Sequence, residues 1–428
     1  MGTAASGTGL QQTTSYRVVL PFYIYAAISF LVACILLLLN TRVLHLHYFQ
    51  PQTLAITHVM ALGWGTMIIL GASHQLLPAL IDGKLSSNTL AYLAFGFAAT
   101  GIPFLVTGFY LFQTGWLLQT GAALVNAAII CYLINVISSI YETKKCGIHA
   151  IFILTATGWL FATTCFGLLL VFNFTRAWLP DNSVEYLSLH AHMGIAGWFL
   201  LLVLGVASRL IPMFLISKYT SQKRLWWIYS LVNLGLIGFI LLKIFAEPGL
   251  VFYVPAVLIG IALILFAGYC QKAYKVRLRK QVDEQMKLSL LSVAFLLLPI
   301  LSLMVVIAFM AGNQHANSIL LYGFCIFFGW ITAIIFGMTF KTLPFIVWNK
   351  VYHDKAAKGK TPAPKELFGE KLFKWMNFFY LSGFVSFILG ILFLYNPLLI
   401  TGASALLLAA ILYVSNVARI VLHKAKTV

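Results

Sequence analysis

One helical signature occurs three times along the chain. It runs His58-(x)4-Gly63-Trp64-(x)6-Gly71-(x)5-Leu77-Pro78, then His192-(x)4-Gly197-Trp198-(x)6-Gly205-(x)5-Ile211-Pro212, and then Phe324-(x)4-Gly329-Trp330-(x)6-Gly337-(x)5-Leu343-Pro344. The copies begin 134 and 132 residues apart. Because Trp and Pro number only 10 and 13 in 428 residues, three Gly-Trp pairs with Gly and Pro at the same distances indicate an internal repeat.

The composition indicates an integral membrane protein. Hydrophobic residues make up 61% of the chain and charged residues 9%, with a mean hydropathy of +0.95, whereas soluble domains are about half apolar and about a quarter charged. A bilayer core ~30 Å thick needs ~20 apolar residues in a helix, and the sequence contains twelve such runs. They fall at about 18–40, 54–80, 88–112, 116–140, 149–174, 187–214, 226–246, 249–271, 288–312, 318–348, 375–395 and 398–421.

We therefore expect an all-α membrane protein with twelve transmembrane helices, which forms a single domain over residues 1–428. The signature lies on the second, sixth and tenth helices, so it divides the chain into three four-helix repeats at about 18–140, 149–271 and 288–421. We expect these repeats to be arranged with pseudo-threefold symmetry.

The basic residues predict the orientation. If the N-terminus and the loops after every second helix form one side, all but three of the 28 basic residues lie there, the exceptions being Arg42, Arg176 and Lys243. Lys and Arg are retained in the cytoplasm, so both termini are expected to be cytoplasmic. This topology and attraction to lipid headgroups explain the net charge of +18, so the lipid bilayer is the expected partner and nucleic acid is not.

Two histidines occupy the same repeat position inside the membrane. The 20 residues from His58 to Pro78 span ~30 Å as a helix, and the topology places His58 and His192 near the outer face. A ligating side chain inside a membrane is a functional candidate, and neutral imidazole is a common ligand for haem iron and for copper. The signature glycines are compatible either with close helix packing or with the approach of a flat ligand.

A further histidine precedes the second copy. His190 and His192 are two residues apart, ~200° around a helix, so they cannot chelate one ion and are expected to serve two pockets. In this interpretation His58 and His190 face one pocket and His192 faces the next. His45, His47 and His315 belong to outer loops, and the sequence leaves open whether they supply replacement ligands.

Twelve helices in three units, with outer-side histidines on the second and sixth, resemble subunit I of the haem-copper oxidase superfamily, including its nitric oxide reductase branch. The sharpest similarity is His190-Ala191-His192 followed by Gly205 and by Pro212-Met213-Phe214. It is similar to that family's tenth helix, where His-x-His supplies one axial ligand to each of two haems. The resemblance implies haem b as the cofactor, copper as a second candidate, and His58, His190 and His192 as cofactor and metal ligands.

The sequence also departs from that family. The His-x-His pair lies on the sixth helix, and the tenth carries Phe324 where a ligand is expected. The run at 226–246 lacks the paired histidines of the family's copper site, and all ten carboxylates fall in loops or at helix ends. We therefore expect a divergent member with fewer metals.

Three functions follow as hypotheses. The first is a haem protein of a prokaryotic inner membrane, comparable with the NnrS family of twelve-helix haem-copper proteins, which works with a redox partner or additional subunits in electron transfer or in nitric oxide or oxygen chemistry. The second is a complete oxygen or nitric oxide reductase, which would make the chain an oxidoreductase. The third is a cofactor-free carrier or assembly factor for a metal or small solute. The sequence leaves open which holds, whether the protein is an enzyme, and how many haems it binds.

Overall fold

The computed structural model describes residues 14–44, 48–143, 147–247, 249–308, 316–353 and 361–425. Within these residues twelve helices are long and apolar enough to cross a membrane. The expectation of an all-helical membrane protein with twelve spans is therefore confirmed. His45, His47 and His315 lie outside the described residues, so their expected roles stay untested.

The elements follow the three copies of the signature. The first part contains α1 (Tyr16–Leu39), α2 (Pro51–His58), η1 (Val59–Thr66), α3 (Met67–Leu80), α4 (Asn88–Tyr110) and α5 (Trp116–Thr143). The second contains α6 (Ile148–Asn173), α7 (Leu187–His192), η2 (Met193–Leu200), α8 (Leu201–Leu215), α9 (Gln222–Phe245), η3 (Leu250–Phe252) and α10 (Tyr253–Lys275). The third contains α11 (Glu284–Phe295), α12 (Leu297–Ala308), α13 (Ala316–Phe324), η4 (Cys325–Ile331), α14 (Thr332–Tyr352), η5 (Pro364–Glu366), α15 (Glu370–Leu392) and α16 (Asn396–Val421).

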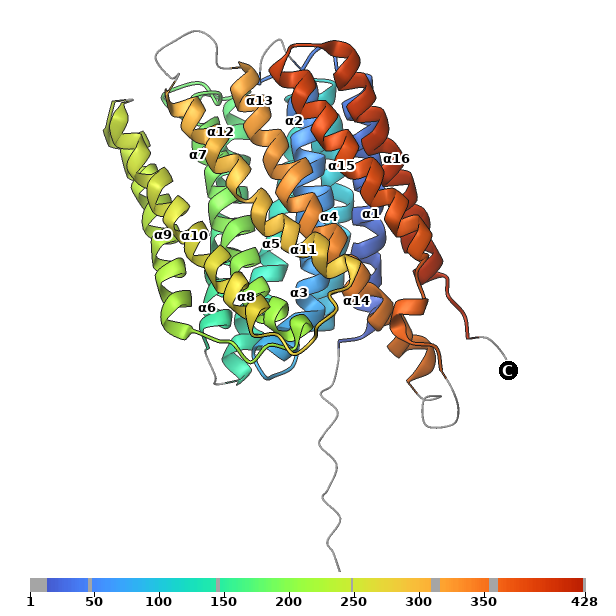
Figure 1. Cartoon of the computed structure of the whole chain (residues 1–428). Coiled ribbons are helices and arrows are strands. Elements are labelled where there is room, and N and C mark those ends of the chain that lie inside the picture. Colours follow the sequence, from blue (N-terminus) through green and yellow to red (C-terminus); the bar gives the residue numbers. More distant parts are fainter. Residues whose placement is uncertain are drawn as a thin grey trace, which may run out of the picture.

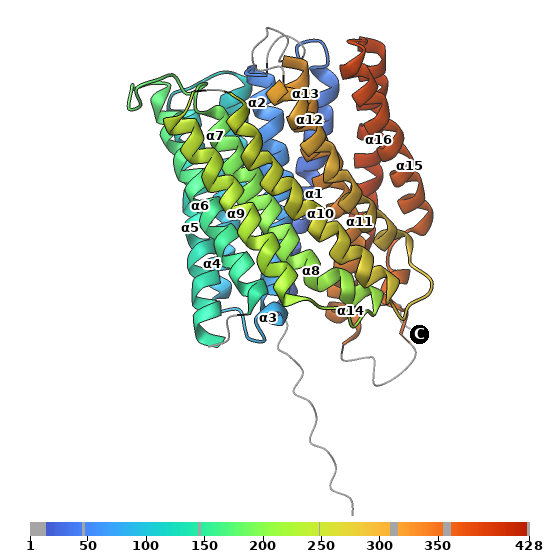
Figure 2. The ribbon, with the colours of Figure 1, turned by 60° about the vertical axis from the view of Figure 1, so that its left-hand side comes forward.

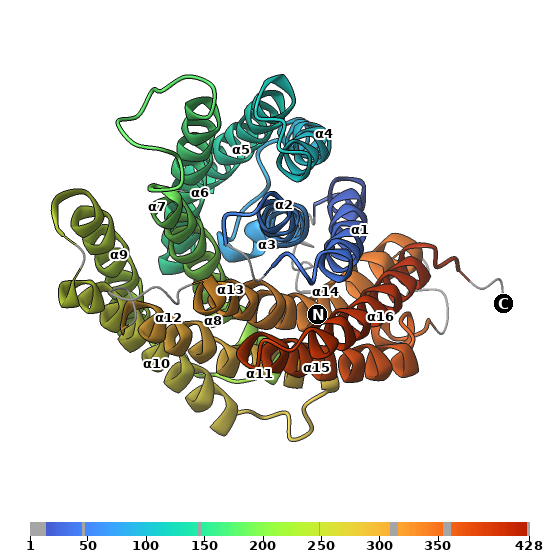
Figure 3. The same ribbon diagram turned by 90° about the horizontal axis from the view of Figure 1, so that it is seen from above.

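The signature helices form the centre of the bundle. Seen along the bundle, α2–α3, α7–α8 and α13–α14 lie innermost, and the remaining helices surround them (Figure 3). In their most apolar stretches 72% of the residues are buried, against 22% to 50% in the other nine spans. Three pairs, α4 with α5, α9 with α10 and α15 with α16, pack as outer hairpins (Figures 2 and 3). The start of α1 and the end of α16 lie at the same end of the bundle, and α2, α7 and α13 lie toward the other end (Figure 1).

Close helix packing accounts for the signature glycines. A Cβ atom on Gly63 would lie 2.7 Å from Ser29 Oγ, and one on Gly71 would lie 2.7 Å from Phe22 Cβ, both on α1. In the second copy Gly197 and Gly205 make the corresponding contacts with Trp159 and Phe152 of α6. Such separations leave no room for a side chain, so each glycine lets its helix approach the first helix of the same copy. These four glycines do not line the large cavity described below.

The three central helices also meet around a small apolar cavity of about 110 Å³. Most of its lining residues occupy the same signature positions in each copy. Three such sets are Ile68, Leu202 and Ile334; Ala72, Val206 and Met338; and Leu76, Leu210 and Thr342. The three signature helices therefore contribute matching faces to an apolar core at the centre of the bundle.

Two helices extend beyond their predicted apolar runs. The runs at 318–348 and 375–395 leave residues 349–374 between them, whereas α14 continues to Tyr352 and α15 begins at Glu370. Apolar runs mark the part of a helix that lies in lipid, and a helix can extend past that part on polar residues such as Lys350.

Candidate functional site

Each signature copy changes from α-helix to π-helix at the same position. His58 is the last residue of α2, His192 of α7 and Phe324 of α13, and the π-helical segments η1, η2 and η4 begin at the next residue. Short π-helical stretches inside helices are frequent at functional sites, because the wider turn redirects side chains. The two candidate ligand positions are thus presented by the same backbone feature at the end of the bundle away from the termini (Figure 1).

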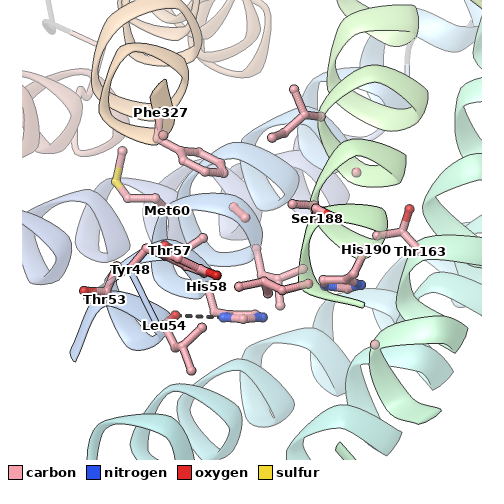
Figure 4. Close-up of a pocket in the computed structure, with 18 of the residues that line it drawn as sticks. Tyr48, Thr53, Leu54, Thr57, His58, Met60, Thr163, Ser188, His190 and Phe327 are labelled. Carbon is pink, nitrogen blue, oxygen red and sulfur yellow. Dashed lines mark hydrogen bonds between the residues drawn. The ribbon is translucent and has the colours of Figure 1, made fainter. Parts of the chain in front are cut away.

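His58 has one ring nitrogen fixed and one free. Its Nδ1 lies 2.7 Å from the carbonyl oxygen of Leu54, one turn earlier. Because a carbonyl can only accept, Nδ1 carries the proton and Nε2 keeps its lone pair. The ring also stacks on Phe109 of α4, with centroids 4.4 Å apart. The nitrogen that is not bonded to Leu54 points toward His190 (Figure 4).

His190 faces His58 from α7. The two ring centroids are 6.4 Å apart and the ring planes differ by 20°. Gly167 of α6 makes room for the His190 ring, since a Cβ there would lie 2.7 Å from Cε1. The Nδ1 atom of His190 is buried and has no hydrogen-bond partner among the described residues. A buried polar atom without a partner costs ~1–3 kcal/mol, which makes this imidazole a candidate to hold a bound group.

His192 has its own set of contacts. Its Nδ1 lies 2.7 Å from the carbonyl oxygen of Ser188, one turn earlier, and its ring packs on Phe239 of α9 at 4.7 Å. The Tyr322 hydroxyl of α13 lies 3.2 Å from Nε2. Since Nδ1 is the donor to Ser188, Tyr322 donates to Nε2. Both nitrogens of His192 are therefore hydrogen-bonded.

Phe324 occupies the histidine position in the third copy. Its ring stacks on Phe387 of α15, with centroids 4.4 Å apart and planes at 20°. An aromatic ring on the third helix of each copy thus packs against the signature residue, as Phe109, Phe239 and Phe387 do. The third copy keeps this stacking and has no ligand.

One cavity connects these residues. It has a volume of about 480 Å³, and His58, His190, His192, Tyr322 and Phe324 all line it. Cavities of ~300–1,000 Å³ are typical of small-molecule and cofactor sites. The expectation placed His192 in a pocket separate from His58 and His190, whereas the three side chains share this cavity.

The walls of the cavity are mostly apolar. Apart from the three histidines, Lys243 of α9 is the single basic side chain among the described residues that line it, and Glu185 is the single acidic one. Lys243 is also one of the three basic residues that the sequence places on the side opposite to all the others. The cavity can thus hold a large apolar group that carries a small number of polar substituents.

Two buried tryptophans connect the central helices. Trp198 Nε1 donates to Thr66 Oγ1, and Trp64 Nε1 donates to Thr332 Oγ1, both at 3.1 Å. In each pair the hydroxyl lies two residues after the signature tryptophan of another copy. The corresponding residue for Trp330 is Leu200, which has no acceptor. These bonds fix the register of the first central helix against the other two.

The donor set suits an iron porphyrin better than a bare metal ion. No group of three His, Cys, Asp or Glu side chains that could hold a metal ion occurs among the described residues. Copper sites built from protein ligands need about that number, whereas haem iron takes four nitrogens from the porphyrin and one or two from protein. Metal–imidazole bonds are ~2.0–2.1 Å long, so two axial imidazoles have centroids about 6 Å apart. The 6.4 Å between the centroids of His58 and His190 is close to that separation.

Sequence reasoning missed several residues of the site. Tyr322 was not singled out, although it lies two residues before Phe324, as His190 lies two residues before His192. Alignment of the third copy against the second would have found it. The stacking phenylalanines and the tryptophan–threonine bonds carry no comparable signal, because they come from helices distant in the sequence.

Comparison with known protein-family models finds no match, and no curated protein matches the chain. Function is therefore inferred from the geometry of the site.

Proposed function

We propose that the chain is a membrane electron-transfer protein that binds haem b between His58 and His190. The observation that carries this proposal is the pair of near-parallel imidazoles with centroids 6.4 Å apart. His58 contributes a free Nε2, because its other nitrogen is held by Leu54, and a metal-ligating histidine usually donates its second N–H in this way. His190 contributes a buried ring nitrogen that has no partner among the described residues.

The surrounding residues fit the same group. The cavity is largely apolar, as a porphyrin requires, and Phe109 holds the His58 ring in orientation. Lys243 offers a cation to the haem carboxylates. When bound, a haem whose two axial positions are both filled by protein supplies one-electron transfer and leaves iron no open position for oxygen or nitric oxide. This favours electron transfer over a complete reductase, and copper has no three-ligand site among the described residues.

We infer the wider organisation from the same features. The three signature copies represent three four-helix repeats around a pseudo-threefold axis, which is supported by the matching walls of the central cavity. The surplus of basic residues on the side of the termini supports a cytoplasmic location of both ends. The haem would then lie near the outer face of a prokaryotic inner membrane, within reach of a redox partner or a further subunit. Such a protein resembles a haem-copper oxidase subunit I that binds fewer metals.

The visible spectrum of the purified protein tests the proposal. After growth with ample haem, the oxidised protein should show a Soret band, and dithionite should produce sharp bands of a reduced six-coordinate haem that carbon monoxide leaves unchanged. His58→Ala and His190→Ala should each lose these bands. His192→Ala is the matched control, because His192 makes the same backbone bond and also packs on a phenylalanine ring, and it should keep them.

Absence of haem bands in well-folded protein would contradict the proposal. In that case the chain would be a cofactor-free carrier or assembly factor, with the histidines as transient metal ligands. Bands that shift with carbon monoxide would instead indicate an open iron and would return nitric oxide or oxygen chemistry to consideration.

A further inference from the structure

The contact between His192 and Tyr322 occupies the same place between the second and third copies as the contact between His58 and His190 does between the first and second. His58 and His192 share one signature position, and His190 and Tyr322 share the position two residues before it in the next copy. The ring centroids are 6.4 Å apart in the first pair and 5.8 Å in the second, with planes at 20° and 22°. The two pairs are thus related sites with one different partner.

That partner decides what the site can bind. In the first pair both side chains are imidazoles, and Nε2 of His58 is free. In the second pair the Tyr322 hydroxyl donates to Nε2 of His192 across 3.2 Å, so the lone pair needed for a metal bond is in use. The phenol ring also fills the side on which a group bound to Nε2 would lie, since its centroid is 5.8 Å from that of the imidazole.

At the third pairing of positions the chain has Phe324 and Ile56, which both line the cavity and have no ligating atom. The three related positions therefore contain two imidazoles, one imidazole bonded to a phenol, and no ligating group at all. The first two sites differ in the partner side chain, because in both the signature histidine makes the same backbone bond and its ring packs on a phenylalanine.

We propose that Tyr322 closes a second haem site and limits the chain to one haem. This inference rests on the proposed haem between His58 and His190, and it assigns His192 as a residue held by Tyr322 and not as an iron ligand. Tyr322 acts in two ways. Its hydroxyl donates a hydrogen bond to the Nε2 lone pair of His192, and its ring occupies the space beside that nitrogen.

Haem content per polypeptide, measured as the pyridine haemochrome, tests the inference. The parent should hold one haem, and His192→Ala should hold one haem with an unchanged spectrum. Tyr322→Ala removes both the hydroxyl and the ring, so titration with haemin should add a second haem that is five-coordinate and binds carbon monoxide. The double variant His192→Ala/Tyr322→Ala should return to one haem, which separates specific binding from haemin dissolved in detergent.

Tyr322→Phe is the matched variant, because it keeps the ring and removes the hydroxyl alone. It should remain at one haem. Two haems in the parent, or a folded Tyr322→Ala that takes up no second haem, would each overturn the inference while leaving the haem between His58 and His190 in place. Loss of haem in His192→Ala would overturn both the inference and the assignment of the haem to His58 and His190. A parent without haem would instead refute the proposed function itself.

Discussion

His58 and His192 have the same surroundings on two sides and differ on a third. Each ends an α-helix before a π-helical segment, donates Nδ1–H to a carbonyl 2.7 Å away, and packs its ring against a phenylalanine of the third helix of its copy. His58 then faces His190, whereas His192 faces and accepts from Tyr322. The comparison teaches that the fold alone does not make a ligand site. The side chain two residues before the next signature position decides whether the histidine is free to bind.

Exchange of that side chain should have the largest effect. His190→Tyr would give the first pair the partner of the second, so the new hydroxyl should donate to His58 Nε2 and haem should be lost. The decrease in haem affinity should exceed the ~10–100-fold typical of changes to outer-shell partners. Haem content of the purified variant measures it, with His353→Tyr, an exposed position outside the cavity, as the control. Full haem content in His190→Tyr would break the comparison.

The phenylalanines that pack on the histidines should affect haem affinity in the first copy only. Phe109→Leu removes the ring at 4.4 Å from His58, which loosens the orientation of the ligand, and haem affinity should fall about tenfold. Phe239→Leu removes the corresponding ring beside His192 and should leave haem affinity unchanged. Haemin titration of both variants measures the difference. Equal losses would indicate that His192 also holds iron.

The tryptophan–threonine hydrogen bonds predict that equivalent tryptophans in different copies contribute differently to the free energy of unfolding. Trp198→Phe loses both ring volume and the bond to Thr66, whereas Trp330→Phe loses ring volume alone, because Leu200 stands at the acceptor position. Trp198→Phe should therefore lower the free energy of unfolding by ~1 kcal/mol more than Trp330→Phe. Unfolding of the haem-free proteins in detergent measures this difference. A larger loss for Trp330→Phe would contradict the assignment of the bonds.

Lys243→Gln should have the smallest effect. Lys243 lies one turn after Phe239 on α9 and lines the cavity on the side of the second copy. It can attract a haem carboxylate from there, and an exposed charge pair contributes ~0.2–1 kcal/mol, so haem affinity should fall only a few-fold. Arg176→Gln, an exposed change outside the cavity, is the control. A loss as large as that of His190→Tyr would place the haem at the second pair.

The sequence predicted the features that depend on local patterns. Hydropathy located twelve spans, which the structure confirms within the described residues, and the repeated signature directed attention to His58 and His192. Spacing also predicted that His190 and His192 point apart, and they face different partners, although both line one cavity instead of the two pockets expected. The predicted helix end at residue 348 was wrong, since α14 continues to Tyr352. Hydropathy marks the part of a helix that lies in lipid and not its last hydrogen-bonded residue.

Contacts between copies could not be predicted in this way. The pairing of Tyr322 with His192 joins residues 130 positions apart, and that of Trp64 with Thr332 joins residues 268 apart. Such pairings depend on the order in which the central helices pack, which local patterns do not encode. Hydrophobic periodicity also does not predict the π-helical segments, although all three begin at the residue after the signature position.

The electron paramagnetic resonance spectrum of the oxidised, purified protein tests the central claim most directly. If His58 and His190 both bind iron, the spectrum should contain one low-spin ferric signal of a haem with two nitrogen axial ligands, and this signal should vanish in His58→Ala and persist in His192→Ala. A high-spin ferric signal, a second haem signal that depends on His192, or a protein without haem would contradict the account.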